Sequence, residues 1–320
     1  MKPIYIGATL QDSGKTSISL GLMQILRDRG LKPGYCKPVG QHYVRYQDKN
    51  IDEDGVLMHQ VFHLTDEPYL LSPIAIEKGF TKKFIENPDV GPLEKKILDV
   101  DVQLRRSHPM IIYEGTGHAG VGSCFGLSNA RVAQLLGAKV VIVTAGGIGR
   151  PIDEIAVSLA LFREYQVEVL GIILNKVLPE KYDKIKETAA KGLRLLGTEL
   201  VGAVPYDPSL AEFTVGQVAE EFSYKILCGT DALSNRINHT VIAAMEPQHV
   251  FKHIVDNTLV IIPGDRVDNI LITILLLSRY TDKNGGMILT GGFEPHPAIE
   301  PLLRSSQIPV LLSDDDTFTV

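Results

Sequence analysis

A Gly-Lys-Thr sequence near the N-terminus has the composition of a phosphate-binding loop. Gly14, Lys15 and Thr16 follow an apolar run at residues 4–8 and precede an amphipathic run at residues 17–29. This order predicts a strand, a loop and a helix. In such a loop, backbone N–H groups surround phosphate oxygens, and the positive end of the following helix adds to the attraction. The lysine would reach the β- and γ-phosphates, and the threonine hydroxyl would hold Mg²⁺.

The loop departs from the pattern G-x-x-x-x-G-K-[ST] at Thr9, where the pattern has glycine. The order of strand, loop and helix still fits the motif. The alternative is a chance Gly-Lys-Thr sequence before an ordinary helix. On the first interpretation a nucleotide contacts the residues of the loop, which are Gln11, Asp12, Ser13, Gly14, Lys15, Thr16 and Ser17.

Acidic residues at two further places could serve a bound cation. Asp48, Asp52, Glu53 and Asp54 precede a helical run, and Glu114 follows an apolar strand pattern and precedes glycines. Mg²⁺ takes one or two carboxylates beside the phosphates and keeps several waters. The acidic cluster equally fits capping of a helix N-terminus. Glu114 is a candidate metal ligand or water-positioning residue, and the alternative is an acidic turn residue.

Three other polar residues lie where strands are expected to end or in glycine-rich sequence. Open parallel sheets bind ligands at the carboxyl ends of their strands, so Lys37 could face a phosphate or an acidic substrate, or be solvated. Asn175, after the strand pattern at 167–174, could pair with an adenine edge or form a turn. His118 lies among the five glycines of residues 115–126. A histidine in such a loop is more often structural or solvent-facing than catalytic.

Strand and helix patterns alternate over the first 205 residues or so. Such alternation specifies an α/β fold with a doubly wound, mostly parallel sheet. We expect loops or a lid at residues 68–92, where prolines recur. The strand patterns are 4–8, 34–36, 110–114, 138–145, 167–174 and 200–205, and the helix patterns are 17–29, 56–62, 92–106, 128–136, 152–165 and 182–196.

The remainder, residues 209–320, has the patterns of a smaller α/β domain. Polar helix and strand material at 213–246 precedes a strand, an apolar helix and two more strands, at 259–263, 270–277, 287–290 and 309–312. The chain ends directly after a strand-like run, which is compatible with a domain cut short at its C-terminal end.

Composition restricts the class of protein. A chain of 320 residues has room for about two domains. A net charge of −6 argues against a protein that binds nucleic acid through nonspecific phosphate contacts. Cys36, Cys124 and Cys228 lie far apart, so neither a disulfide framework nor a thiolate zinc site is indicated. The apolar run 270–277 is too short to span a bilayer, and the N-terminus has no leader pattern. We expect a cytoplasmic protein that binds neither nucleic acid nor membrane.

The motifs of residues 1–208 together resemble dethiobiotin synthetase and its relatives among the P-loop amidoligases. That family also has threonine at the position of Thr9. The resemblance implies ATP and Mg²⁺ as cofactors. It implies a metal held by Thr16, Asp54 and Glu114, catalytic roles for Lys15, Lys37 and Glu114, and an adenine contact from Asn175.

Residues 209–320 resemble the DRTGG domain, on the segments Gly264-Asp265-Arg266 and Thr290-Gly291-Gly292. The same two domains precede the catalytic domain of long phosphate acetyltransferases, and we do not carry the acetyltransferase activity over. Asp265, Arg266 and the glycines could bind an anionic effector or form turns in a dimer interface.

Two functions follow as hypotheses. The first is an ATP- and Mg²⁺-dependent enzyme, either an ATPase or a ligase that activates a carboxylate or carbamate, with residues 115–126 lining the pocket for an unidentified small molecule. The second is a nucleotide-sensing regulatory protein related to the N-terminal region of phosphate acetyltransferase. Dethiobiotin synthesis itself is less favoured, because residues 60–92 and 115–126 show no match to a diamine site. Relatives of this fold pair across the ligand face, so we expect a homodimer.

Overall fold

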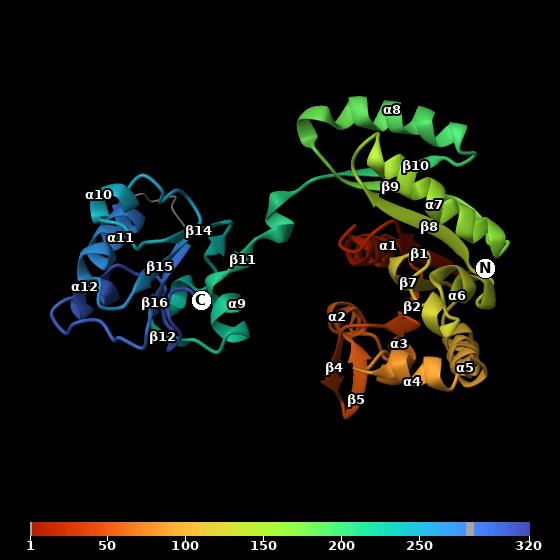
Figure 1. Ribbon diagram of the computed structural model, residues 1–320, viewed down its shortest axis with the longest axis horizontal. Helices are drawn as coiled ribbons and strands as arrows, with labels where there is room; N and C mark the ends of the chain where they lie inside the picture. Colours follow the sequence, from red (N-terminus) through yellow and green to blue (C-terminus); the bar gives the residue numbers. More distant parts are fainter. Residues whose placement is uncertain (1, 280–284) are drawn as a thin grey trace. The chain divides into compact units, whose positions relative to one another are not determined.

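The computed structural model describes residues 2–279 and 285–320. The chain divides into two compact units, Met1–Tyr206 and Asp207–Val320, which are coloured red to green and green to blue in Figure 1. Among the described residues, no helix is both long and apolar enough to cross a membrane.

The first unit is built on a six-stranded sheet in which every pair of neighbouring strands is parallel. The strand order is β10-β9-β8-β1-β7-β2. The strands are β1 (Ile4–Ala8), β2 (Gly34–Cys36), β7 (Ile111–His118), β8 (Lys139–Ala145), β9 (Val169–Val177) and β10 (Leu200–Pro205). The principal helices are α1 (Lys15–Asp28), α2 (Glu53–Phe62), α5 (Gly91–Ser107), α6 (Asn129–Leu135), α7 (Arg150–Glu164) and α8 (Tyr182–Leu195).

Helices cover both faces of this sheet. Helices α1 and α2 pack on the face that carries Ile6 and Ile112, whereas α5, α6 and α7 pack on the face that carries Tyr5 and Tyr113. Alternate residues of one strand therefore enter different cores, as expected for a parallel sheet buried on both sides. The predicted doubly wound α/β fold is confirmed.

The segment between β2 and α5 contains elements that the sequence patterns did not indicate. An antiparallel hairpin joins β4 (Tyr43–Tyr46) to β5 (Lys49–Asp52). The stretch 68–92, expected as a loop or lid, contains two short helices and a strand. The remaining elements here are β3 (Val39–Gly40), α3 (Pro68–Leu71), β6 (Ile74–Ala75) and α4 (Phe80–Glu86). The hairpin is functionally relevant because β5 leads directly into α2 and its acidic residues.

His108, the C-cap of α5, joins three chain segments. Its Nε2 lies 2.8 Å from Asp66 Oδ1 and its Nδ1 lies 3.1 Å from the carbonyl oxygen of Lys32. The hydrogen bond to Asp66 raises the pKa of His108 above its ordinary value of 6.5, although partial burial opposes this. The charged imidazolium is therefore favoured in the folded protein.

We expect His108 to make stability depend on pH. A raised folded-state pKa contributes stability that is fully present below pH 6.5 and is lost as the pH rises through the folded-state pKa. Urea unfolding of the wild type and of His108→Gln should therefore differ most at about pH 6 and converge toward about pH 9. A difference that stays constant across this range would contradict the charged pair.

The second unit contains a five-stranded sheet in the order β12-β17-β16-β15-β14, in which only β12 is antiparallel to its neighbour. Its strands are β12 (Lys225–Cys228), β14 (His239–Ile242), β15 (Thr258–Pro263), β16 (Gly285–Thr290) and β17 (Val310–Leu312). A small antiparallel pair is formed by β11 (Phe213–Thr214) and β13 (Arg236–Ile237). The helices are α9 (Val215–Glu221), α10 (Pro247–Val250), α11 (Val267–Arg279) and α12 (Glu300–Ser305).

The two motif segments of this unit contact each other at the ends of β15 and β16. The Gly264 N–H donates to the carbonyl of Thr290 at 3.0 Å. A side chain on Gly264 would place its Cβ 2.3 Å from the Phe293 carbonyl oxygen. Arg266 donates to the carbonyls of Ala244 and Met245 at 3.2 Å and pairs with Asp268 at 2.9 Å. Arg266 is thus engaged within the fold, which favours the turn interpretation over an anion site.

Candidate functional site

The predicted phosphate loop lies between β1 and α1, and neighbouring strands brace it. The Thr9 N–H donates to the Val143 carbonyl at 3.1 Å, and the Thr9 hydroxyl pairs with that of Thr144 at 2.9 Å. Both threonines are buried, so each hydroxyl satisfies the other. Threonine is therefore tolerated where the strict motif has glycine, because β8 offers it a hydrogen-bonding partner.

The end of β9 holds the other side of the loop. Asn175 Nδ2 donates to the Ser13 carbonyl at 3.0 Å, and Lys176 Nζ donates to the Asp12 carbonyl at 2.9 Å. Gly14 has φ of 90°, and a Cβ there would lie 2.0 Å from Asn175 Nδ2. Glycine is therefore required at position 14 for both conformation and space. Asn175 contacts the loop backbone here, and its contact with adenine stays a prediction.

Lys15, the first residue of α1, is a buried cation without an acceptor. Its exposed fraction is 8%, and within the described part of the chain its ammonium has neither a hydrogen bond nor an ion pair. Burial lowers the pKa of Lys15, which the Glu114 carboxylate opposes and the Lys37 ammonium reinforces. A buried charge without a partner is costly. A bound phosphate would supply the missing acceptor.

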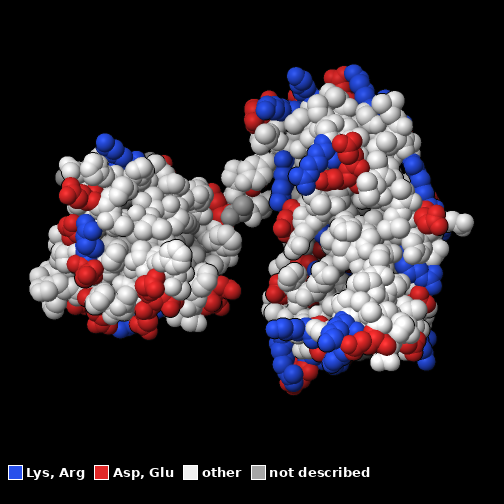
Figure 2. Space-filling view, viewed as in Figure 1, with Lys and Arg blue, Asp and Glu red and all other residues white. Residues whose placement is uncertain are grey.

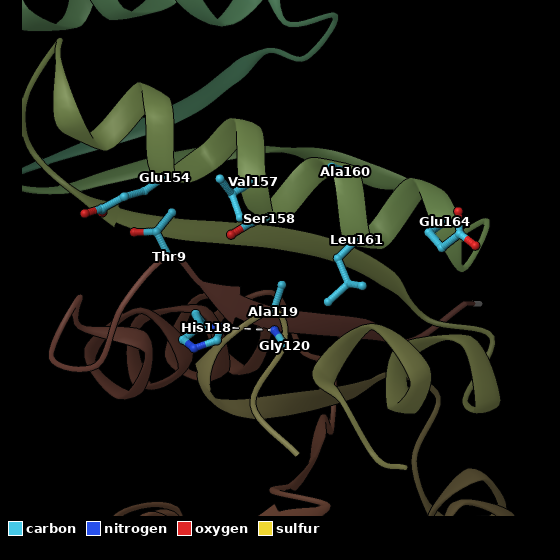
Figure 3. A pocket seen from close by; sticks show the side chains of 10 residues that line it. All are labelled: Thr9, His118, Ala119, Gly120, Glu154, Val157, Ser158, Ala160, Leu161 and Glu164. Atoms are coloured by element: carbon cyan, nitrogen blue, oxygen red, sulfur yellow. Dashed lines mark hydrogen bonds between the residues drawn. The ribbon is translucent and has the colours of Figure 1, made fainter. Parts of the chain in front are cut away.

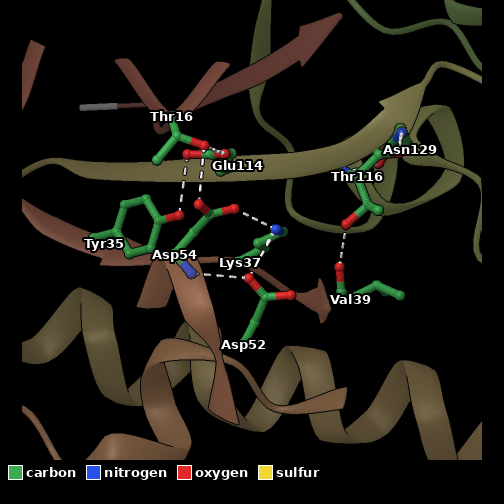
Figure 4. Close-up of polar contacts among 9 residues, drawn as sticks. All are labelled: Thr16, Tyr35, Lys37, Val39, Asp52, Asp54, Glu114, Thr116 and Asn129. Carbon is green, nitrogen blue, oxygen red and sulfur yellow. Dashed lines mark hydrogen bonds and ion pairs between the residues drawn. The ribbon is translucent and has the colours of Figure 1, made fainter. Parts of the chain in front are cut away.

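The three predicted metal ligands, Thr16, Asp54 and Glu114, lie together (Figure 4). Thr16 Oγ1 is 2.8 Å from Glu114 Oε1 and 3.0 Å from Asp54 Oδ1. One hydroxyl hydrogen serves only one of these carboxylates at a time. Tyr35 adds a hydrogen bond to Glu114 Oε2 at 3.0 Å. Oxygens from α1, α2 and β7 thus converge on one point.

Glu114 is the most deeply buried member of this group. Its exposed fraction is 0%, and burial followed by the neighbouring Asp54 charge raises its pKa. The sequence patterns placed Glu114 at the end of a strand, but β7 continues through it to His118. A cation at this point would relieve both causes of the raised pKa, since it offsets the desolvation and screens Asp54.

The donor set fits Mg²⁺ bound together with phosphates. Hydroxyl and carboxylate oxygens are the ligands that Mg²⁺ prefers, and one or two carboxylates suffice when phosphates and waters complete the octahedron. Among the described residues, no group of three or more His, Cys, Asp or Glu side chains is arranged to hold a metal without such help. A phosphate bound by the loop would complete the coordination of a cation here.

Lys37 is buried next to this group and is engaged by two carboxylates. Its ammonium lies 2.7 Å from Asp52 Oδ1 and also contacts Asp54 Oδ2. Burial alone would lower the pKa of Lys37, but Asp52 and Asp54 outweigh it and the pKa is raised. The sequence alone suggested a lysine free to face a phosphate or to be solvated, whereas the structure shows an ion-paired one.

Other predicted residues lie farther from this group. Gln11, Asp12 and Ser17 are exposed on the loop and the first turn of α1. His118 ends β7, and its Nδ1 accepts from the Gly120 N–H at 3.2 Å rather than joining the carboxylates. Sequence reasoning missed Tyr35, Lys176 and the specific role of Asp52. Of these three residues, only Lys176 had a sequence signal that could have pointed to the site, because it directly follows Asn175 near the expected end of a strand.

A cavity of about 600 Å³ adjoins the start of the phosphate loop (Figure 3). It lies between α7 and the segment after β7, so only part of the region 115–126 lines it. Asn129 fixes that segment, because its Nδ2 donates to the carbonyls of Thr116 and His118 at 2.7 and 2.6 Å. The lining residues are Thr9, His118, Ala119, Gly120, Glu154, Val157, Ser158, Ala160, Leu161 and Glu164.

Charged side chains are distributed in small groups over the face shown in Figure 2. On the first unit groups of both signs lie side by side, whereas on the second unit acidic groups outnumber basic ones on this face. Ion pairs of the first unit include Lys139–Glu168, Arg150–Glu154 and Lys191–Glu187, each with a nitrogen–oxygen distance of 2.6–2.7 Å. Exposed pairs of this kind contribute little to stability.

Comparison with protein families matches two consecutive segments. Residues 2–214 match the model of an AAA domain, AAA_26, and residues 217–320 match the model of the DRTGG domain. The predicted order of a phosphate-loop domain and a DRTGG domain is confirmed.

Among curated proteins, the chain is similar to phosphate acetyltransferases. It is 27% identical over 330 residues to the phosphate acetyltransferase of Nitratidesulfovibrio vulgaris, covering 98% of this chain and 46% of that protein. It is 26% identical over 322 residues to the enzyme of Pseudomonas putida, covering 96% of this chain and 44% of that protein. The chain thus spans about half the length of the curated relatives that it matches.

Several solved structures resemble parts of this chain at low sequence identity. A nucleotide-binding protein of Archaeoglobus fulgidus in complex with ADP aligns over 66% of this chain and 84% of its own, with 14% identity and a TM-score of 0.38. The CBS and DRTGG domains of the regulatory region of Clostridium perfringens pyrophosphatase, complexed with the activator diadenosine tetraphosphate, align over 33% of this chain and 43% of their own. Their identity is 22% and their TM-score is 0.28.

Proposed function

Because the chain belongs to the AAA domain family over residues 2–214 and continues into a DRTGG domain, we propose that it binds ATP with Mg²⁺ and transfers the γ-phosphoryl group. The acceptor is water or a small carboxylate or carbamate. The observation that carries the proposal is the buried, unpartnered Lys15 ammonium beside the converging oxygens of Thr16, Asp54 and Glu114, all within the described residues.

The chemistry required of the protein is positioning and charge neutralisation. Phosphoryl transfer passes through a transition state with negative charge on the phosphoryl oxygens, and it needs little covalent help from the protein. Lys15 would place a positive charge against those oxygens, and the loop N–H groups would orient them. When bound, Mg²⁺ would neutralise phosphate charge, held by Thr16, Asp54 and Glu114.

The cavity beside Thr9 suits the acceptor. It touches Thr9 at the start of the phosphate loop and combines apolar side chains of α7 with the polar side chains of His118, Ser158, Glu164 and Glu154, the last of which is paired with Arg150. Small-molecule sites commonly have an apolar lining with a few placed polar groups. Binding there would bring an acceptor to the loop from the α7 side.

A second candidate function is nucleotide sensing without turnover. This function is favoured by the similarity to phosphate acetyltransferase of Nitratidesulfovibrio vulgaris, an enzyme named for another reaction. The alignment covers 98% of this chain but only 46% of that longer enzyme. In that case the chain would have two states with different affinities for ATP, and ATP binding would favour one of them. The two states would differ in the DRTGG domain or in the arrangement of a homodimer.

Two measurements on the full chain separate the two functions: release of ADP, and the change of amide hydrogen exchange in the DRTGG domain when ATP is added. The full chain with Mg²⁺ and ATP, with and without small carboxylic acids, should release ADP well above the same chain in excess EDTA. ADP release at the EDTA level would overturn the enzyme proposal. Sensing then predicts ATP-dependent changes of amide hydrogen exchange within residues 207–279 and 285–320, and their absence would overturn sensing as well.

A further inference from the structure

Asp54 directs its two oxygens at different partners. Oδ1 accepts from Thr16 at 3.0 Å, on the side of Glu114, whereas Oδ2 contacts the Lys37 ammonium. The same carboxylate is therefore shared between the candidate cation position and a protein cation. Its side chain is 25% exposed, which leaves it room to adjust.

Asp52, in contrast, is fixed. It ends β5, its exposed fraction is 0%, and its Oδ1 accepts both the Asp54 N–H at 3.1 Å and the Lys37 ammonium at 2.7 Å. Its Oδ2 has no hydrogen-bond partner among the described residues. A Cβ on Gly40 would lie 2.6 Å from this oxygen, so glycine at position 40 is what makes space for the carboxylate.

The Lys37 ammonium is thus held by one fixed and one shared carboxylate. It contacts Asp54, which accepts from Thr16, the residue that follows Lys15, and its charge is among those that lower the pKa of Lys15. A divalent cation on Asp54 would neutralise that carboxylate and repel the neighbouring ammonium. The bond to Asp54 would weaken, while the bond to Asp52 would persist.

We propose that Asp52 is a positioning residue that anchors Lys37 while Lys37 and the divalent cation compete for Asp54. In the cation-free protein, the Lys37 ammonium contacts both carboxylates and supplies part of the positive charge that the cation would bring. Cation uptake leaves Lys37 on Asp52 with donor capacity free for the space beside Lys15. This inference rests on the proposed function, since it assigns a further role within the same site.

The competition predicts that removal of Lys37 increases the affinity of the site for a divalent cation. Here Lys37→Met removes the competitor, so Mn²⁺ binding to the ADP complex, measured by electron paramagnetic resonance, should tighten about tenfold relative to the wild type. Lys83→Met, which removes an exposed lysine of α4, is the matched control and should leave the affinity unchanged.

Asp52→Asn tests the anchor separately. Asparagine can still accept the Asp54 N–H, so the cap of α2 is kept and only the charge is removed. Lys37 then pairs with Asp54 alone, and Mn²⁺ binding should weaken about tenfold. In a Lys37→Met background the same change should have a smaller effect, because no ammonium remains to be redirected.

The outcomes distinguish this inference from the proposed function. ADP binding with unchanged or weaker Mn²⁺ affinity in Lys37→Met would overturn the competition and leave nucleotide binding intact. Equal effects of Asp52→Asn in both backgrounds would overturn the anchor. Failure of the wild type to bind ADP and Mn²⁺ would overturn both the inference and the proposed function. Lys37→Gln has the same expectation as Lys37→Met and replaces it if the methionine variant does not fold.

Discussion

Lys15→Met should abolish tight nucleotide binding and at the same time stabilise the nucleotide-free protein. The ammonium is buried and has no acceptor within the described residues, so a methionine of similar length removes a buried charge that no hydrogen bond satisfies. The free energy of unfolding without nucleotide should rise by about 1–3 kcal/mol. Affinity for ATP should fall about 100-fold, because charge-assisted hydrogen bonds are worth about 1.5–3 kcal/mol.

The two effects are measured by urea unfolding and by competition with a fluorescent ATP analogue. Lys32→Met is the control, because Lys32 precedes β2 and lies outside the loop. It should change neither quantity by more than about 0.5 kcal/mol. A Lys15→Met protein that is less stable than the wild type would show that Lys15 has a structural role and would contradict this account of the loop.

Glu114→Gln should remove most cation-dependent turnover while nucleotide binding persists. Glutamine keeps the shape of the side chain. Its carbonyl oxygen can accept from one of the two hydroxyls, of Thr16 and Tyr35, and its amide nitrogen can donate to the oxygen of the other, so packing is preserved. The lost charge removes a ligand that suits Mg²⁺, and we expect kcat to fall about 10²–10³-fold. Affinity for ATP measured in EDTA should not fall, because a negative charge near the phosphates has been removed.

This loss is read from ADP release as a function of Mg²⁺ concentration. The exposed Glu67, at the start of α3, provides a control variant of identical chemistry, Glu67→Gln, which should retain wild-type rates. Unchanged turnover in Glu114→Gln would exclude Glu114 as a metal ligand and would leave Asp54 and Thr16 to hold the cation.

The sheet and the phosphate loop could be predicted from sequence because each rests on local patterns. Buried parallel strands such as β8 are almost continuously apolar, and the loop is a contiguous motif. Thr9 could be accommodated only through Thr144, which lies 135 residues away. No local pattern contains that partner.

The hairpin β4–β5 was missed for a physical reason. Its strands alternate poorly between apolar and polar residues, and β4 is largely exposed. Its turn residues, Gln47 and Asp48, both have positive φ, at 46° and 62°. Such turns usually carry Asn-Gly or Asp-Gly, so the usual hairpin signal is absent.

The arrangement of the carboxylates also lay beyond local reasoning. The cluster at residues 48–54 offered several equivalent acidic side chains, and only the fold separates their positions. Asp52 is enclosed beside Gly40, and Asp54 reaches Thr16. Asp48, in contrast, is exposed in the turn of the hairpin. The pairing of Lys37 with two of these carboxylates depends on that separation.

The most direct test of the central claim is a calorimetric titration of ATP into the wild-type chain, with Mg²⁺ and with EDTA. The account predicts one ATP bound per chain, with higher affinity when Mg²⁺ is present, because Thr16, Asp54 and Glu114 then act on the phosphates through the cation. The absence of binding under both conditions would contradict a nucleotide site at the loop that contains Lys15.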